Sequence, residues 1–171
     1  MVVDLAPGAR MPPKLLYDLA RVDLARVAVP MDDVRRVNPQ RFEFEQVTRI
    51  VHLDDEAQVI VGVREVRGDE FWVRGHIPGR PLFPGVLMCE CAAQVATFYY
   101  HLRTPAISGM FVAFGGLDEV RFRGAVVPGD TFVVVAHAER MKARQGVFAT
   151  QGLVRGEVVF EAKVIGIPMP A

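Results

Sequence analysis

The sequence predicts an α+β domain in which one long buried helix packs against an antiparallel sheet. Three observations support this fold class. A segment that begins at Val86 has a helix-forming composition and is apolar nearly all round. Runs of strand-forming residues lie on both sides of it, and most of them follow it. Turn signals separate the later strands, which favours an antiparallel meander over crossover units.

Six segments have the composition and patterning of strands. Two precede the helix and four follow it: residues 42–51, 59–66, 110–122, 131–140, 146–154 and 157–167. Turn residues occupy positions 127–130 and 155–156 between the later strands. The length of 171 residues and the hydrophobic content of 51% suit a single globular domain with a sizeable core.

The predicted helix starts after Pro84 and ends before the helix breaker Pro105. Between residues 86 and 100 its only strongly polar side chains are Glu90 and Gln94. Burial of a carboxyl group in apolar surroundings disfavours the charged form, so Glu90 is a candidate general acid. Gln94 lies one turn further on the same face, where its amide could hydrogen-bond and orient the carboxyl group.

His76 begins a loop that leads into this helix and contains three prolines and two glycines between residues 78 and 85. Such a loop holds an irregular path and allows close approach of the backbone. The free amides of Gly85 and Val86 at the helix start would stabilise a developing oxyanion. A single histidine at a strand end is most often structural, but this loop and the buried Glu90 favour an acid/base pair at the mouth of an apolar pocket.

The pattern from His76 to Glu90, His-x-Pro-Gly-x-Pro-x-x-Pro-Gly-x-x-x-x-Glu, resembles the active-site signature of β-hydroxyacyl-acyl-carrier-protein dehydratases of the FabZ type. Residues 38–42 resemble the opening Pro-His-Arg-Tyr segment of that family. Residues 114–122 and 126–130 are similar to the strand and turn after its helix. The resemblance implies a hotdog fold, in which a curved antiparallel sheet wraps around one long central helix.

The resemblance leaves residues 1–37 outside, so we expect an N-terminal arm followed by a dehydratase-like domain over residues 38–171. The arm is too apolar for a solvated tail, and we expect it to pack across a subunit or over the pocket mouth. Residues 30–37 could form a short helical turn with Asp32 near its start.

The resemblance also implies an activity, the dehydration of 3-hydroxyacyl thioesters of acyl carrier protein to trans-2-enoyl thioesters in fatty acid biosynthesis. His76 would remove the α-proton, and Glu90 would protonate the departing hydroxyl group. The Gly85 and Val86 amides would hold the thioester carbonyl. The substrate would arrive on phosphopantetheine, and no metal or other cofactor is expected. In this family the histidine and the glutamate of one site come from different subunits, so we expect a homodimer and leave open a trimer of dimers.

Two further sets of residues are candidates for contacts with the substrate and its carrier. Candidates for an acyl tunnel are Phe83, Leu87, Phe98, Phe111 and Phe114. Aromatic residues at such spacings are more often ordinary core. Candidates for docking an acidic acyl carrier protein are Arg121, Arg123, Lys142 and Arg144. A solvated sheet face is an equally good interpretation of these charges.

Composition excludes several classes of function. The 20 basic and 20 acidic residues balance, so no net field favours nucleic acid or an anionic membrane. No apolar run reaches the roughly 20 residues of a membrane span, and no secretory signal is evident, so we expect a cytoplasmic protein. Cys89 and Cys91 fit small core residues better than a zinc site, a disulfide or a nucleophile. The remaining histidines are interpreted as structural: His52, His101 and His137.

The chain departs from the family pattern at Phe42, where the family usually has tyrosine, and at Ile77, where phenylalanine usually follows the histidine. Related dehydratase-isomerases place aspartate at the acid position, so Glu90 argues against isomerisation. Two other functions are weighed, a hotdog thioesterase and a non-catalytic subunit that binds acyl carrier protein. Release of free thiol would identify the first, and binding without turnover the second. The sequence does not indicate acyl chain length or pathway.

Overall fold

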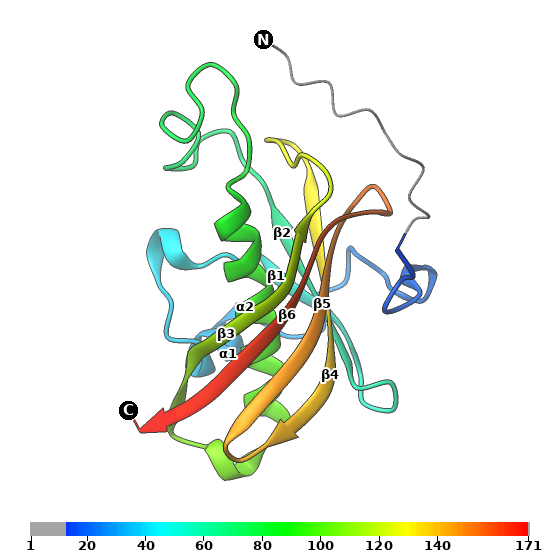
Figure 1. The fold of residues 1–171 in the computed structure, drawn as a ribbon, viewed down its shortest axis with the longest axis vertical. Helices are drawn as coiled ribbons and strands as arrows, with labels where there is room; N and C mark the ends of the chain where they lie inside the picture. Colours follow the sequence, from blue (N-terminus) through cyan, green and yellow to red (C-terminus); the bar gives the residue numbers. More distant parts are fainter. Residues whose placement is uncertain (1–12, 171) are drawn as a thin grey trace.

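The computed structural model describes residues 13–170 and has a single antiparallel sheet wrapped around a long helix (Figure 1). The strands run in the order β1-β2-β4-β5-β6-β3. Their bounds are β1 (Arg49–Asp54), β2 (Val59–Glu65), β3 (Met110–Phe122), β4 (Thr131–Lys142), β5 (Gln145–Val154) and β6 (Glu157–Pro170). The helix is α2 (Gly85–Arg103). This is the α+β hotdog architecture that the sequence predicted.

Five of the six predicted strands agree with the structure to within a few residues at their ends. The prediction for residues 42–51 was wrong in its first half, where Phe42–Phe44 form a 3-10 turn (η2) and Phe42 adopts a φ of 55°. Nearby backbone groups bond to a helix side chain instead of a neighbouring strand, because Gln94 donates to the Phe44 carbonyl and accepts from the Gln46 amide. The strand therefore begins only at Arg49.

The core lies between α2 and the concave face of the sheet. Tyr99 and Tyr100 of α2 are fully buried, and phenylalanines from the later strands pack around the helix. The helix approaches β2 so closely that a Cβ atom at Gly62 would lie 2.5 Å from a methyl group of Val95. Burial of almost the whole helix confirms the prediction from its apolar sequence.

The described part of the arm packs on its own chain. Tyr17 and Val22 cover valines on the convex face of the sheet, and the Tyr17 hydroxyl donates to Asp54 over 2.7 Å. Next come the 3-10 turn η1 (Leu19–Arg21) and the short helix α1 (Met31–Val37), whose Val34 joins the core beside α2. The arm was predicted to pack across a subunit or over the pocket mouth. Residues 13–24 cover the back of the sheet instead, and residues 1–12 of the predicted arm lie outside the described residues.

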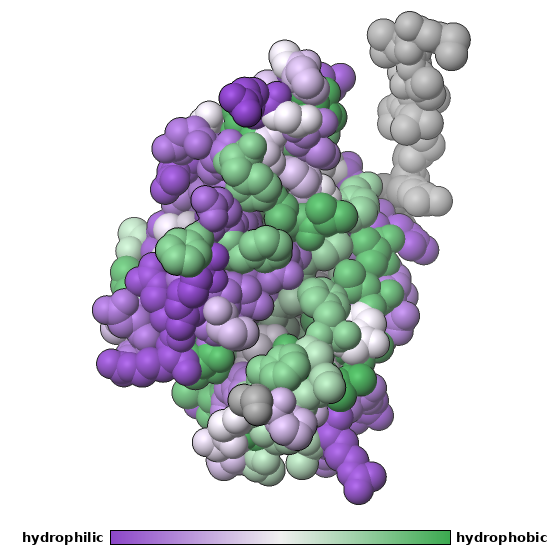
Figure 2. Space-filling view, turned by 90° about the vertical axis from the view of Figure 1, so that its left-hand side faces the viewer, coloured by the Kyte–Doolittle hydropathy of each residue, from purple (hydrophilic) through white to green (hydrophobic). Residues whose placement is uncertain are grey.

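The β3 strand forms one edge of the sheet, because β6 is its only partner strand within residues 13–170. Several large apolar side chains on or near this strand are exposed: Phe111, Phe114, Phe122, Ile167 and Met169. Figure 2 views the molecule from the left-hand side of Figure 1, and apolar surface alternates there with strongly polar patches. An exposed edge with apolar side chains is a template for pairing with another chain.

Within residues 13–170, no helix is long and apolar enough to cross a membrane. The same residues contain no cluster of three or more histidine, cysteine, aspartate or glutamate side chains that could hold a metal ion.

Candidate active site

His76 lies in the irregular segment between β2 and α2, and its side chain is exposed. Its Nδ1 atom lies 2.8 Å from the carbonyl oxygen of Leu82. A carbonyl oxygen can only accept a hydrogen bond, so Nδ1 carries the proton and Nε2 of the neutral ring keeps its lone pair. The backbone amide of His76 donates to the carbonyl of Trp72 over 2.8 Å. The loop therefore fixes the tautomer that a general base requires.

Glu90 is half-buried on α2, and Gln94 donates from Nε2 to its Oε1 atom over 2.7 Å. Gln94 is only 3% exposed and is itself held in place. Its Oε1 accepts from the Gln46 amide over 2.9 Å, and its Nε2 donates to the Phe44 carbonyl over 2.6 Å. The amide of Gln94 is thereby fixed as a donor to one oxygen of Glu90.

The Glu90 side chain lines a small hollow between α2 and strands β3 and β6. The hollow is lined by Gln40, Glu90, Ala93, Thr97, Val112, Ala113, Phe114, Val164, Ile165 and Gly166. Apart from Glu90, only Gln40 and Thr97 among these residues carry polar side chains, and Gln40 Oε1 is buried without a partner among the described residues. His76 does not line this hollow, so one chain does not bring His76 and Glu90 to the same cavity.

A second, apolar cleft of about 570 Å³ lies at the start of α2. It is lined by Leu82, Phe83, Gly85, Val86, Met88, Phe122, Arg123, Gly124 and Ala125. Pro84 precedes the helix without a side-chain cap, and the first turn leaves the amides of Gly85 and Val86 without an acceptor among the described hydrogen bonds. A Cβ atom at Gly85 would lie 2.8 Å from the Phe122 ring, so glycine permits this close packing.

The five tunnel candidates do not share one cavity within a chain. Phe83 lines the cleft at the start of α2, whereas Phe114 lines the hollow beside Glu90. Phe98 is buried in the core, Leu87 packs against the core, and Phe111 is exposed near the start of β3. A single tunnel through all five is therefore not formed by one chain.

The four docking candidates lie at two separate places on the sheet of one chain. Arg121 pairs in register with Glu161 of β6, whereas Lys142 at the end of β4 and Arg144 in the β4–β5 turn lie close to the level of Gly166. That separation is roughly 15 to 20 Å along the sheet.

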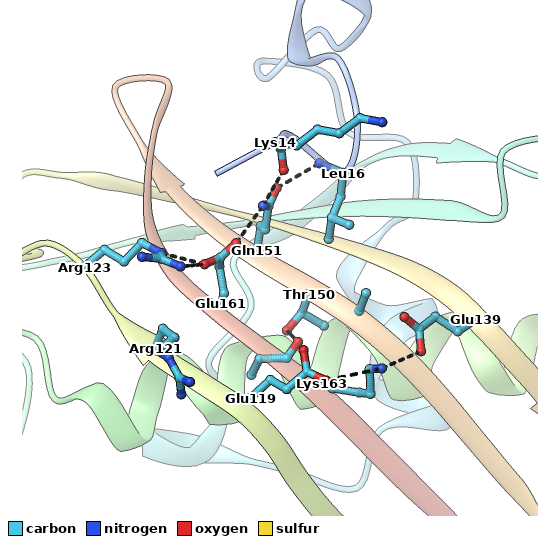
Figure 3. Close-up of a pocket in the computed structure, with 12 residues that line it drawn as sticks. Lys14, Leu16, Glu119, Arg121, Arg123, Glu139, Thr150, Gln151, Glu161 and Lys163 are labelled. Atoms are coloured by element: carbon cyan, nitrogen blue, oxygen red, sulfur yellow. Dashed lines mark hydrogen bonds and ion pairs between the residues drawn. The ribbon is translucent and has the colours of Figure 1, made fainter. Parts of the chain in front are cut away.

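The surroundings of Arg121 and Arg123 are of mixed charge, as Figure 3 shows for the convex face of the sheet. Arg123 forms an ion pair with Glu161, and Lys163 lies 3.2 Å from Glu139. Gln151 holds the arm at the same place by donating to the Lys14 carbonyl and accepting from the Leu16 amide. This neighbourhood is a salt-bridged surface and not a uniform basic patch.

Both cysteines are buried, and burial raises the pKa of each thiol. Cys91 is fully enclosed and donates to the carbonyl of Gln46. His52 contacts the Tyr17 hydroxyl at 2.9 Å, and burial lowers the pKa of His101. These contacts fit the structural roles predicted for the cysteines and for the two histidines.

Sequence reasoning missed three residues around the two cavities. Phe122 lines the cleft, Gln40 lines the hollow, and buried Trp72 contacts both the His76 backbone and the Phe83 ring. Apolar residues in strands give no sign of which cavity they line. A glutamine in a short irregular segment carries no periodic signal, and only the signature at residues 38–42 pointed to that segment.

Comparison with known proteins places these features in context. A family model described as a FabA-like domain matches residues 38–163. The 3-hydroxyacyl-[acyl-carrier-protein] dehydratase FabZ of Herpetosiphon aurantiacus is 37% identical over 131 residues, which cover 77% of this chain and 92% of that protein. The protein of the same name from Desulforamulus reducens is 34% identical over 132 residues, with coverage of 77% and 92%.

Solved structures show the same fold at low sequence identity. The dehydratase heterocomplex ApeI:P from Xenorhabdus doucetiae superposes with a TM-score of 0.66 at 15% identity, covering 80% of this chain and 90% of that chain. A hypothetical thioesterase with coenzyme A from Streptococcus pneumoniae has a TM-score of 0.59 at 11% identity, with coverage of 82% and 98%. At such identities the likeness establishes the fold alone.

Proposed function

The chain belongs to the FabA-like family and is a 3-hydroxyacyl-[acyl-carrier-protein] dehydratase of the FabZ type, and we propose that His76 and Glu90 carry out its reaction. The observation that supports this assignment of residues is the tautomer of the His76 ring. Its Nδ1 proton is bound by the Leu82 carbonyl, so Nε2 is left as the base. Glu90, oriented by Gln94, is the matching acid.

In the proposed mechanism the thioester carbonyl accepts hydrogen bonds from the amides of Gly85 and Val86, which acidifies the α-carbon. His76 Nε2 removes the α-proton. Protonated Glu90 gives its proton to the 3-hydroxyl group, and the C–O bond breaks to release water because hydroxide alone is a poor leaving group. The electron pair of the broken C–H bond forms the C2–C3 double bond of the trans-2-enoyl thioester. Both steps are proton transfers and require no metal or redox cofactor.

We propose that the site is completed by two chains in a homodimer. The separation of His76 from the hollow beside Glu90 supports this arrangement. The free edge of β3 and its exposed Phe111, Phe114 and Phe122 offer a surface on which a second copy would pair. Such pairing would cover the apolar cleft and the hollow together and exclude water from the reaction.

We also propose that the substrate is delivered by acyl carrier protein through its phosphopantetheine arm. The names of the relatives support this carrier. Arg74 and Arg80 are exposed on either side of His76 and offer positive charge at the site itself. Of the docking residues predicted from the sequence, only Arg123 lines the cleft. Arg123 is paired with Glu161, so attraction of an acidic carrier to Arg74 and Arg80 would speed association.

The test uses subunits that are each missing one catalytic group. His76→Ala and Glu90→Gln chains are co-expressed with different affinity tags, and mixed dimers are isolated. Hydration of a trans-2-enoyl thioester on acyl carrier protein is followed by the loss of enoyl absorbance. Each variant dimer alone is expected to be inactive with its fold and dimer intact. The mixed dimer contains one complete site of two and should show about half of the wild-type activity.

Three outcomes would contradict the proposal. Activity of the His76→Ala dimer would exclude His76 as the base. Inactivity of the mixed dimer, with wild type active, would show that each site is built from one chain. Release of free thiol by the wild type instead of enoyl hydration would indicate a thioesterase.

A further inference from the structure

Glu70 lies in the segment between β2 and His76, and its side chain is only 6% exposed. Its Oε2 atom accepts from the indole Nε1 of Trp72 over 3.0 Å and forms an ion pair with Arg64 of β2. Its Oε1 atom accepts from the backbone amide of Arg67 over 2.7 Å. A buried carboxylate with three donors is held rigidly, since each oxygen is bound.

Trp72 is 3% exposed and connects Glu70 to both halves of the candidate active site. Its carbonyl accepts the backbone amide of His76 over 2.8 Å. Its ring packs edge-on against Phe83, with ring centroids 5.5 Å apart. Phe83 directly precedes Pro84 and the helix start that carries the two free amides. Trp72 therefore contacts the backbone of the base through its carbonyl and the segment that leads to the oxyanion amides through its ring.

We propose that Glu70 is a positioning residue for the dehydration. Its carboxylate, anchored on Arg64, fixes Trp72 and thereby sets the distance between His76 and the amides of Gly85 and Val86. This inference rests on the proposed function of His76. Glu70 lines a cavity that shares no lining residue with the cleft at the start of α2. It therefore touches neither the substrate cleft nor its apolar lining.

Trp72 is the only tryptophan of the chain, so tryptophan fluorescence reports on the surroundings of this one residue. Glu70→Gln keeps the size of the side chain and an acceptor oxygen but removes the charge that pairs with Arg64. In the intact dimer we expect the Trp72 emission to shift and its quenching by acrylamide to increase. We expect kcat to fall about 10- to 100-fold, because a displacement of about 1 Å costs that much. KM for the acyl-carrier substrate should change less than about twofold, since uniform binding is untouched.

The matched control is Asp69→Asn, which makes the same change of charge one residue earlier. Asp69 is 75% exposed and pairs with the exposed Arg67, so kcat and Trp72 emission should match wild type. Trp72→Phe keeps an aromatic ring but lacks the indole N–H. It should show the same loss of kcat at unchanged KM, and it decides the question if Glu70→Gln does not fold.

Wild-type kcat in a folded Glu70→Gln dimer would overturn the inference, as would wild-type kcat in Trp72→Phe. A rise in KM with kcat unchanged would also overturn it, because the loss would then be one of binding. The His76→Ala variant distinguishes a failure of the positioning role from a failure of the proposed function. If His76→Ala is inactive while Glu70→Gln is fully active, the positioning role fails and the proposed function stands. If His76→Ala is active, the proposed function fails.

Discussion

Gln94 hydrogen-bonds both the candidate acid Glu90 and the backbone of the preceding segment. Its replacement should therefore reduce both stability and activity. Gln94→Met keeps the approximate volume but removes the hydrogen bonds to Glu90, Phe44 and Gln46. At about 1 kcal/mol of net stability for each bond, the loss is about 3 kcal/mol. The Gln46 amide is buried and would be left without a partner, which alone costs about 1 to 3 kcal/mol. We therefore expect the free energy of unfolding to fall by about 2 to 4 kcal/mol.

Activity should fall for a separate reason. Without the donor from Gln94, the Glu90 carboxyl group can rotate away from the departing hydroxyl group, and kcat should drop about 10- to 100-fold. Urea denaturation followed by circular dichroism measures the first effect, at equal protomer concentration for every variant because the proposed dimer would make stability depend on concentration. The rate of enoyl hydration at low urea concentration measures the second effect, the fall in kcat.

The control is Gln145→Met, at the start of β5 beside the β4–β5 turn, where the side-chain oxygen of Gln145 accepts from Arg140. Its stability should stay within about 0.5 kcal/mol of wild type, and its kcat should be unchanged. A Gln94→Met protein as stable as Gln145→Met would refute the role of Gln94 in holding the η2 segment. Full activity at reduced stability would refute its role in orienting Glu90.

Three further predictions concern packing and pH. Burial raises the pKa of the Cys91 thiol, and both cysteines are buried. Thiol reagents at pH 8 should therefore label neither cysteine of the folded protein, but both in concentrated urea. Rapid labelling of the folded protein would contradict this burial. The Ala57 amide and the Tyr17 hydroxyl lower the pKa of Asp54 below its ordinary value of 3.8, so its stabilisation is present at neutral pH and is lost as pH falls through the lowered value. Asp54→Asn should therefore lower Tm at pH 7, and the difference from wild type should shrink below about pH 4; a constant difference would exclude ionised Asp54 as its cause. Gly62→Ala should lower the free energy of unfolding, measured by urea denaturation, by about 1 to 3 kcal/mol, because the new Cβ atom would lie 2.5 Å from a methyl group of the helix. Gly68→Ala is the control: its Cβ atom would have its nearest neighbour at 3.9 Å, so stability should not change.

The chemistry of the site was readable from the sequence where residue type and spacing together restrict the possibilities. A single carboxylate and a single amide on an apolar helix, one turn apart, predicted the Glu90 and Gln94 pair, and their hydrogen bond is present. The loop after His76 likewise predicted free amides at the helix start. These features depend on contacts that are local in sequence, so no knowledge of the tertiary fold was needed.

The tunnel and docking sets could not be read in the same way, because they depend on strand register. The strand pattern at Arg121 and Arg123 gave no information about their distance from the β4–β5 turn, which is set by the pairing of four strands. Nor did the sequence show that Glu161 neutralises Arg123 from the neighbouring strand. For the aromatic residues, a slip in register or a second chain decides which cavity each one lines.

The position of the arm had a signal in the sequence, carried by the strands that it covers. Antiparallel sheets with one solvated face alternate apolar and polar residues, but residues 59–63 and 132–136 are apolar throughout. Val61 and Val135 face away from α2 and are fully buried, so a second layer must lie over them. Among the described residues, the helix covers one face and apolar residues of the arm pack on the other. Tyr17 and Val22 do so, with Asp54 and Gln151 fixing the arm at two points. Residues 13–24 therefore pack on the sheet of the same chain and cover the face that α2 leaves open.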